Sequence, residues 1–493
     1  MIASQLPVLL IVLPLMTAPL CVLLGGRRLA YLLALTVSAC VFGISLALMA
    51  RVLQSGPIHY DIGGWQPPYG IEYVVDYLSG FVMLFVSAIA AIVLAYAPRT
   101  VELEIPGSKH TLFYASYLLC LTGLLGMCIT GDLFNVFVFL EISSLSSYAM
   151  ISLARTRRAP LAALRYLILG TVGATFFLIG IGLVYQMTGT LNLDDIAHRL
   201  PREGGPRTIL VAFAFMTIGL CIKMAVFPVH SWLPNAYTYA PSAVTAFIAA
   251  TSTKVSVYIF IRLVYDIFTP EFAFDLLPLD SELTTLALVG IFVASTSAIY
   301  QSDVKRLLAY SSIAQIGYML LGISMGTQEG LTAGIVHMFN HALIKGGLFM
   351  VVGCYALQLR SVQLEDWRGA GRTMPWTSMA WALGGLGLIG VPVTVGFVSK
   401  WLLLTTAVQT EHWAVAVLML VSSLLAVVYI WRVVETLYFH EPSGRAARAK
   451  EAPLSMLVPT YVVIAATLLF GVWTTYSAGL AGRAAAALLG AGS

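Results

Sequence analysis

The sequence predicts an all-α polytopic membrane protein with about fourteen transmembrane helices. Of its 493 residues, 59% are hydrophobic and only 10% are charged, whereas a soluble domain carries roughly a quarter charged residues. Apolar runs of about 20 residues, the length that crosses a bilayer as a helix, follow one another along the whole chain. This pattern excludes soluble, disulfide-rich, collagen-like and disordered classes.

The predicted spans are bounded by Gly, Pro or charged residues, and no connection is long enough for a soluble domain. Their approximate limits are 5–24, 29–50, 77–96, 111–129, 133–153, 161–187, 208–228, 242–267, 283–300, 307–326, 331–357, 376–406, 412–436 and 453–478. The first run lacks a small-residue cleavage site, so we expect a helix rather than a removed signal peptide. The longest gap, from Arg51 to Asp76, is rich in Gly, Pro and Tyr and is expected to form an ordered outer loop.

Basic residues in alternate loops predict the orientation. One set of loops carries fifteen of them: Arg27, Arg28, Arg99, Lys109, Arg155, Arg157, Arg158, Lys305, Arg306, Arg360, Arg368, Arg372, Arg445, Arg448 and Lys450. The other set carries five: Arg51, Arg199, Arg202, Arg207 and Arg483. Because cytoplasmic loops carry the excess of Lys and Arg, we expect both termini outside, in a multi-pass protein of a bacterial cell (inner) membrane.

Four of the seven lysines lie deep inside predicted spans, at Lys223, Lys254, Lys345 and Lys400. Each such charge costs at least about 2.5–3.5 kcal/mol at mid-membrane. One of them could belong to an ion pair that only fixes helix packing, but buried pairs contribute little net stability. Four are better explained by a proton path, because burial favours the neutral form of lysine. Three arginines near span ends are expected to reach the interface: Arg165, Arg262 and Arg432.

Glu141, in GDLFNVFVFLEISSLSSYAM, is the only acid deep within a span. It is the natural counter-charge for one of the lysines. A Glu–Lys pair that opens and closes changes the affinity of the lysine for its proton, so it can act as a switch. Asp132, nine residues earlier, is expected at the mouth of the helix.

The eleventh span contains HMFNHALIKGGLF, in which His337, His341 and Lys345 recur every four residues and therefore share one helical stripe. A lone histidine in such a place is often only a hydrogen-bonded packing residue. Two histidines with a lysine indicate a polar track, since imidazole exchanges protons near physiological pH. Metal binding is the weaker alternative, because no third soft ligand or carboxylate lies nearby in the sequence.

Two of the charged spans are interrupted. In the seventh, Pro228 follows Lys223 in KMAVFPVHSWLP, and in the twelfth Gly390, Pro392 and Gly396 precede the lysine of LIGVPVTVGFVSKW. Proline breaks the hydrogen-bond ladder of a helix, and membranes tolerate this only inside protein or beside a cavity. Paired broken spans in two halves of a chain point to the site of a transporter.

An internal repeat relates these halves. LNLDD (191–195) follows the sixth span and VQLED (362–366) follows the eleventh, 171 residues later. Segments five spans apart run in opposite directions, so we infer two inverted five-helix repeats, spans four to eight and nine to thirteen. The expected segments are an N-terminal three-helix part, the first repeat, the second repeat, and a C-terminal helix with a tail: 1–110, 111–268, 283–436 and 437–493.

Several stretches together resemble one family. They are KMAVFPVHSWLPNAYTYAPSAVTAFIAATSTK (223–254), QSDVKRLLAYSSIAQIGY (301–318), HALIKGGLF (341–349) and GFVSKW (396–401). The chain is similar, from the fourth span to the thirteenth, to the antiporter-like subunits shared by respiratory complex I and Mrp-type multisubunit Na⁺/H⁺ antiporters.

The resemblance implies roles for particular residues. Glu141 and Lys223 match the essential ion pair of the family, Lys254 its central proton-carrying lysine and Lys400 the terminal residue on the broken twelfth helix. The polar link between the central and terminal sites matches His337, His341 and Lys345. His230, beside the first break, is expected either to line hydrated space or to serve packing.

The local sequences DLFNVFVFLEISSLSSYAM and GFVSKWLL look most like those of the D-type subunit of Mrp antiporters. Lys400 argues against the complex I subunit type that carries Glu there, and the chain ends too early for the largest paralogue. The resemblance therefore implies the proton-translocating subunit of a Na⁺/H⁺ antiporter. The alternative is a proton-pumping subunit of a redox-driven complex, of NADH:quinone oxidoreductase or membrane-bound hydrogenase type. An independent solute carrier fits less well.

The sequence contains no Cys framework for an Fe–S cluster, no GxGxxG after a strand and no P-loop. We therefore expect no cofactor or metal in this chain and no enzyme activity on its own. The expected partners are other membrane subunits, protons, Na⁺ and the lipid bilayer, without nucleic acid. Glu141 is already committed to a lysine, so we expect the Na⁺ path in a partner subunit.

Overall fold

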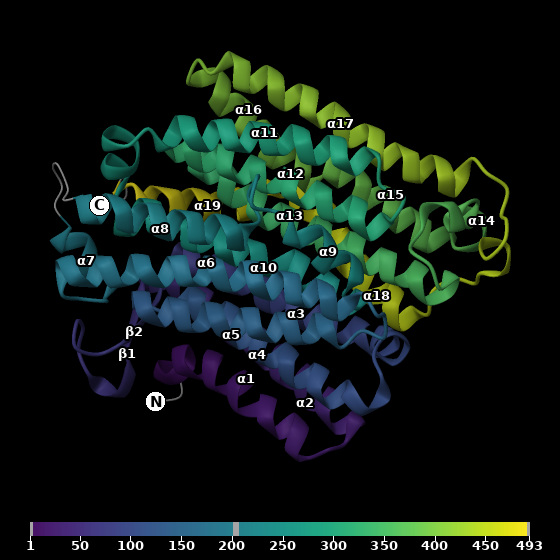
Figure 1. Ribbon diagram of the computed structural model, residues 1–493, viewed down its shortest axis with the longest axis horizontal. Coiled ribbons are helices and arrows are strands. Elements are labelled where there is room, and N and C mark those ends of the chain that lie inside the picture. The colour runs from purple at the N-terminus through teal and green to yellow at the C-terminus, as the bar shows by residue number, and fades with distance from the viewer. Residues whose placement is uncertain (1–2, 201–206, 491–493) are drawn as a thin grey trace.

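The computed structural model describes residues 3–200 and 207–490, which form a bundle of long helices running side by side (Figure 1). In these residues, thirteen helices are long and apolar enough to cross a membrane. They are α1 (Leu6–Leu23), α2 (Arg27–Ser55), α3 (Tyr77–Glu104), α4 (His110–Ile129), α5 (Leu133–Ser152), α6 (Ala159–Thr188), α8 (Arg207–Met224), α10 (Ser242–Arg262), α11 (Leu279–Ile299), α12 (Val304–Ser324), α13 (Gln328–Leu359), α17 (Trp413–Tyr438) and α18 (Leu454–Val472). The predicted all-α polytopic fold is confirmed.

The remaining predicted span, the twelfth, is divided into α15 (Pro375–Ile389) and α16 (Val395–Gln409). Each half alone is too short to cross the membrane, which is why thirteen long helices correspond to fourteen predicted spans. The seventh span is also interrupted, because α8 is followed after a gap by α9 (Trp232–Tyr239). Both predicted breaks are therefore present.

Short elements connect the long helices. The α-helical ones are α7 (Leu193–Arg199), α14 (Ala370–Thr373) and α19 (Thr474–Leu488). The 3₁₀ turns are η1 (Ala3–Gln5), η2 (Ile62–Gly64), η3 (Gly107–Lys109), η6 (Leu364–Trp367) and η7 (Ala446–Arg448), and the π-helical turns are η4 (Leu263–Ile267) and η5 (Glu271–Leu276). In the predicted C-terminal tail, α19 packs against α3 and α13.

The predicted outer loop contains a β-hairpin, which the sequence did not indicate. Strand β1 (Ile58–Asp61) pairs antiparallel with β2 (Glu72–Val75), with Ile58 opposite Val75. Tyr73 also bridges to Thr130, which ties the hairpin to the end of α4. Four-residue strands are too short for their alternation to stand out in so apolar a chain. The hairpin lies at the end of the molecule where both termini are found (Figure 1).

Two matching β-bridges mark the internal repeat. Asp132 bridges to Asn192 and Asp303 bridges to Gln363, so both partners shift by 171 residues between the halves. The aspartates also cap equivalent helices: Asp132 accepts the backbone N–H of the third residue of α5 at 2.7 Å, and Asp303 does so for α12 at 3.0 Å. The Asp132–Asn192 bridge lies beside the hairpin, and the Asp303–Gln363 bridge lies at the opposite end of the bundle. The two repeats are thus inverted.

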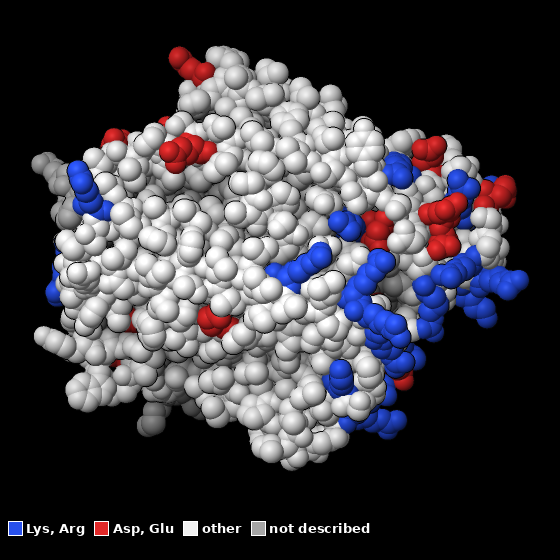
Figure 2. Space-filling model, viewed as in Figure 1, with Lys and Arg blue, Asp and Glu red and all other residues white. Residues whose placement is uncertain are grey.

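Charge is unevenly distributed between the two ends. Figure 2 shows Lys and Arg gathered at the end where α14 lies, while the middle of this face is almost free of charge. This end is opposite to the one that holds both termini (Figure 1). Arg202 lies outside the described residues. Lys305 departs from the loop pattern, since it is buried and its ammonium donates to the Ala240 carbonyl at 2.9 Å.

Candidate functional site

The ion pair expected from the sequence joins α5 to α8. The Lys223 ammonium donates to Glu141 Oε1 at 3.3 Å and to Ser144 Oγ at 2.8 Å. The lysine side chain is 4% exposed, whereas 22% of the Glu141 side chain remains exposed. The Glu141 carboxylate is therefore partly accessible from outside the protein, whereas the Lys223 ammonium is enclosed by it. The structure brings these two residues together, and their role in proton movement stays a prediction.

Glycines set the approach of α6 to α8. A Cβ at Gly219 would lie 2.5 Å from the Gly173 carbonyl oxygen and 2.9 Å from the Phe177 nitrogen. Backbone atoms cannot give way as a flexible side chain can, so only glycine fits at this contact. Lys223 lies one turn further along α8, so this contact helps to fix its position relative to α6.

The break in the seventh span follows Lys223 directly. Helix α8 ends at Met224, and Ala225 has a φ of 61°. The Trp232 indole N–H, on the far side of the break, donates to the Ile222 carbonyl at 2.9 Å. It thereby satisfies one of the carbonyls that an interrupted helix leaves without a partner.

His230 lies within this break. Its ring stacks beside that of Phe227 with a centroid separation of 5.5 Å, and its Nδ1 is buried without a hydrogen-bond partner among the described residues. A buried ring nitrogen without a partner is uncommon and is compatible with water in the break. The packing contact with Phe227 is equally present, so both expectations for His230 remain open.

Lys254 on α10 is almost completely buried. Its ammonium donates to the Ala249 carbonyl at 2.5 Å and lies 3.4 Å from Thr253 Oγ1, both on its own helix. Among the described residues no carboxylate forms an ion pair with it. Helix α10 packs against both α8 and α13. The helix of the central lysine therefore contacts the helix of the ion-paired lysine and the helix of the predicted track.

The stripe on α13 is formed as the sequence predicts. His337 Nδ1 shares a hydrogen bond of 2.8 Å with Ser399 Oγ, and the parallel His337 and His341 rings are 6.3 Å apart. Lys345 donates to the Leu308 carbonyl at 2.9 Å and to a serine hydroxyl on α12. Both ring nitrogens of His341 are buried without a partner in the described structure. In the described part of the chain, no three His, Cys, Asp or Glu side chains are grouped to hold a metal ion.

Lys400 lies at the second break. Its ammonium donates to the carbonyls of Ile389 and Leu388, at 2.8 and 3.2 Å, where α15 ends. Carbonyls at the C-terminal end of a helix carry partial negative charge, so the broken helix itself stabilises this ammonium. The Asn340 side chain on α13 donates to the Val395 carbonyl at 2.5 Å and so holds the start of α16.

Tyr318 on α12 is a site residue that the sequence reasoning missed. Its ring centroid lies 5.1 Å from the Lys400 ammonium and 5.5 Å from the His337 ring centroid, and its hydroxyl is 2.5 Å from Ser422 Oγ. The ring is thus adjacent to both the end of the histidine track and the terminal lysine. The only sequence signal was its place at the end of the quoted QSDVKRLLAYSSIAQIGY stretch.

A second missed cluster surrounds Arg262. Its guanidinium binds both carboxylate oxygens of Asp76, at 2.5 and 2.6 Å, and Asp266 at 2.5 Å. Arg262 lies at the end of α10, as expected, and its guanidinium is held there by two aspartates. Burial alone would raise the pKa of the Asp76 carboxyl, but the adjacent guanidinium holds that pKa below its usual value. The three residues line a cleft of about 960 Å³ beside the hairpin.

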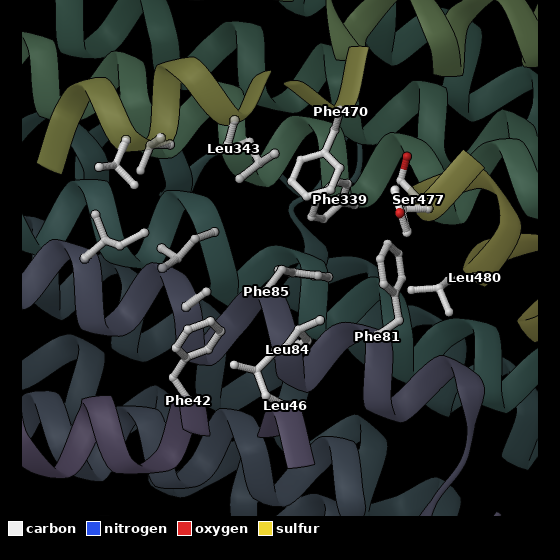
Figure 3. A pocket seen from close by; sticks show the side chains of 17 residues that line it. Phe42, Leu46, Phe81, Leu84, Phe85, Phe339, Leu343, Phe470, Ser477 and Leu480 are labelled. Carbon is white, nitrogen blue, oxygen red and sulfur yellow. The ribbon is translucent and has the colours of Figure 1, made fainter. Parts of the chain in front are cut away.

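An apolar pocket of about 400 Å³ is lined by residues of α2, α3, α13, α18 and α19 (Figure 3). Helix α13 contributes Phe339 and Leu343 to it. At about 100° per residue, these lie on the opposite face of α13 from His337 and His341. The pocket is therefore separate from the polar stripe, and its lining is apolar apart from Tyr476 and Ser477.

Comparisons with known proteins identify the family of this chain. The family profile described as NADH:quinone oxidoreductase/Mrp antiporter, TM, matches residues 130–426. The chain is 41% identical to NADH-quinone oxidoreductase subunit N of Desulforudis audaxviator, over 95% of this chain and 96% of the relative. It is 28% identical to the D-type subunit of the Na(+)/H(+) antiporter of Alkalihalophilus pseudofirmus, over 87% and 85% of the two chains.

Among solved structures, a chain of the membrane-bound sulfane sulfur reductase, an archaeal respiratory membrane complex, superposes with a TM-score of 0.90 at 31% identity and 98% coverage of both chains. The matched family region contains every site residue from Glu141 to Lys400. This chain therefore belongs to the NADH:quinone oxidoreductase/Mrp antiporter transmembrane family.

Proposed function

We propose that this chain is a proton-translocating membrane subunit of a redox-driven respiratory complex of the NADH-quinone oxidoreductase type. One observation carries the proposal. Lys223, Lys254 and Lys345 are buried on three different helices and Lys400 is partly buried on a fourth, and only Lys223 has a carboxylate partner among the described residues. Ionisable groups in such positions mark ion and proton pathways by default.

The proton would enter near the Glu141–Lys223 pair and reach Lys254. It would continue past His341 to Lys400 and leave on the other face. Opening the Glu141–Lys223 pair changes the electric field at Lys254, and in a low-dielectric interior that change acts over a longer distance than in water. The unpartnered ring nitrogens of His341 support its role in the middle of this path, because they can accept or donate a proton through water.

Sequence identity favours the redox-driven complex over the antiporter. The relative named for NADH-quinone oxidoreductase is 41% identical, and the relative named for Na(+)/H(+) antiport is 28% identical, each over most of the chain. The Mrp-type antiporter, which the sequence motifs favoured, is the second candidate. Exchange of Na⁺ would then rest on a partner subunit, since Glu141 is already paired with Lys223.

The proposal includes an arrangement in the membrane. The end that carries most Lys and Arg would face the cytoplasm, and both termini would lie outside, in a bacterial inner membrane. Other subunits of the complex would supply the redox centres, so this chain would contribute proton transfer and no cofactor. The divisions 1–110, 111–268, 283–436 and 437–493 would correspond to the N-terminal part, the two repeats and the C-terminal part.

Purification of the native complex tests the choice between the two candidates. We expect flavin and iron–sulfur absorption together with NADH oxidation that drives proton movement. A complex without these centres, in which Na⁺ gradients drive proton movement, would establish the antiporter instead.

Replacement of Lys254 tests the proton path in the same complex. We expect Lys254→Ala to reduce proton translocation in vesicles to background, because no other buried amine of the described residues can take its place between Lys223 and the α13 stripe. The matched control is Thr251→Ala, one turn away on α10, whose hydroxyl only bonds to its own helix at 2.7 Å. Full translocation by an assembled Lys254→Ala complex would overturn the path.

A further inference from the structure

A buried hydroxyl lies beside the ion pair without a partner. Tyr148 is 6% exposed, and its hydroxyl forms no hydrogen bond with the described residues. A buried hydroxyl without a partner costs stability, so such groups call for a physical explanation. Tyr148 follows Glu141 by seven residues on α5, with Ser144 between them, and residues at this spacing share one face of a helix.

Gly170 on α6 lets the Tyr148 hydroxyl pack directly against its Cα. A Cβ at position 170 would lie 1.9 Å from the Tyr148 hydroxyl oxygen and 3.6 Å from the Lys223 ammonium nitrogen. The two polar atoms therefore both lie beside Gly170 and close to each other. The Lys223 ammonium already contacts Ser144, which lies midway between Glu141 and Tyr148 on α5.

Aromatic rings connect Tyr148 to the helix break. Its ring packs edge-on against Tyr166 at a centroid distance of 4.4 Å, and Tyr166 stacks on Trp232 at 3.8 Å. Trp232 in turn donates to the carbonyl of Ile222, the residue before Lys223. The tyrosine is thus held in place relative to the backbone that carries the lysine.

We propose that the Lys223 ammonium has a second resting position at the Tyr148 hydroxyl. When the pair with Glu141 opens, the ammonium donates a hydrogen bond to the hydroxyl oxygen of Tyr148. This inference rests on the proposed proton-translocating function and deepens it. Ser144 remains a ligand in both positions, so the ammonium moves along α5 from a carboxylate to a neutral hydroxyl. No proton is transferred in this movement, and Glu141 is left without its cation. Tyr148 is therefore a positioning residue.

The first experiment measures proton translocation and assembly of the native complex in Tyr148→Phe. The ring and its stacking partners remain, so assembly is expected to be normal. Loss of a hydrogen bond to a charged group is expected to slow translocation about tenfold. The control is Tyr117→Phe on α4, which removes a buried hydroxyl bonded only to the Ala90 carbonyl and is expected to leave the rate unchanged.

A double variant separates transport from packing. Gly170→Ala is expected to impair both assembly and translocation, because its Cβ meets the Tyr148 hydroxyl. Adding Tyr148→Phe removes that oxygen, so assembly should recover while translocation stays low. Recovery of both would show that Tyr148 only fills space and would overturn the inference.

A structure of the Glu141→Gln complex provides an independent test. With its counter-charge removed, the Lys223 ammonium should be found within hydrogen-bond distance of the Tyr148 hydroxyl. If the Lys223 ammonium stays on residues 141 and 144, the proposed second position is wrong. The same conclusion follows if Tyr148→Phe translocates protons at the wild-type rate while Lys223→Ala is inactive, and in both cases the proton path stands. Full translocation by Lys223→Ala would instead refute the path itself.

Discussion

Lys223, Lys254 and Lys400 differ in what stabilises each ammonium. A carboxylate and a hydroxyl hold Lys223, carbonyl and hydroxyl groups of its own helix hold Lys254, and the end of a broken helix holds Lys400. Neutral oxygens compensate less of the lost hydration than a carboxylate does. The charge on Lys223 is therefore the best compensated of the three, and the lysines beyond it depend more strongly on nearby charges.

Tyr318 offers a test of how the terminal lysine is stabilised. Tyr318→Leu removes the aromatic face beside Lys400, and a cation–π contact is worth about 0.5–2 kcal/mol. We expect proton translocation to fall by roughly two- to thirtyfold. Tyr318→Phe keeps the ring and should stay within about twofold of the wild type. If the Phe variant were as slow as the Leu variant, the hydroxyl on Ser422 would be the important group instead.

The Asp76–Arg262 pair gives a dependence on pH. Because Arg262 lowers the pKa of Asp76 in the folded protein, the pair stabilises the fold above the usual carboxyl pKa of 3.8 and is lost as the pH falls through the lowered value. Asp76→Asn should reduce the free energy of unfolding by about 1–3 kcal/mol at neutral pH. The difference from wild type should vanish in acid, as measured by thermal unfolding in detergent at several pH values.

Asp194→Asn is the control for this measurement, since its carboxylate is largely exposed and should leave stability unchanged. A stability difference at Asp76 that stayed constant down to the lowest pH would exclude the ion pair as its source.

Glycine contacts decide how closely the helices can approach. Gly219→Ala would place a methyl group against backbone atoms of α6, and such overpacking costs about 1–3 kcal/mol. We expect a lower unfolding temperature of the purified complex and slower proton translocation, because α8 carries Lys223 one turn later. Gly182→Ala on α6 is the matched control, since its Cβ would meet no atom within 4 Å. Alanine favours a helix more than glycine does, so helix propensity alone would stabilise both variants. A Gly219→Ala variant as stable as Gly182→Ala would therefore exclude the backbone contact as a constraint.

The broken helices depend on side chains from other elements. The Trp232 indole satisfies a carbonyl at the first break, and Asn340 binds the Val395 carbonyl at the second. The proline and glycine residues in the sequence indicated where each helix would stop. They did not indicate the hydrogen-bond partners, because Trp232 meets Ile222 only through the fold of the break itself and Asn340 lies on another helix.

The distribution of charge predicts the orientation of the whole molecule in the membrane. Tyr69 is 95% exposed at the hairpin end, and Arg157 is exposed in the loop after α5. With a membrane-impermeant thiol reagent on intact cells, we expect labelling of Tyr69→Cys but of Arg157→Cys only after the cells are opened. The unsubstituted protein, which has six cysteines, is the control. The reverse labelling pattern would place both termini in the cytoplasm.

The sequence by itself determined the spans, both breaks, the 171-residue repeat and Glu141 as the counter-charge of one of the lysines, while the resemblance to a family implied that this lysine is Lys223. These follow from apolar run length, from proline and glycine, and from the rarity of charge in the membrane, all of which are local or compositional signals. Only the tertiary structure showed Tyr148 and Tyr318 beside the lysines and Arg262 between two aspartates. Tyrosine is common in this chain, with 23 residues, and its apolar ring is compatible with any buried face. Which tyrosines reach an ammonium depends on how distant helices pack, and no local pattern contains that information.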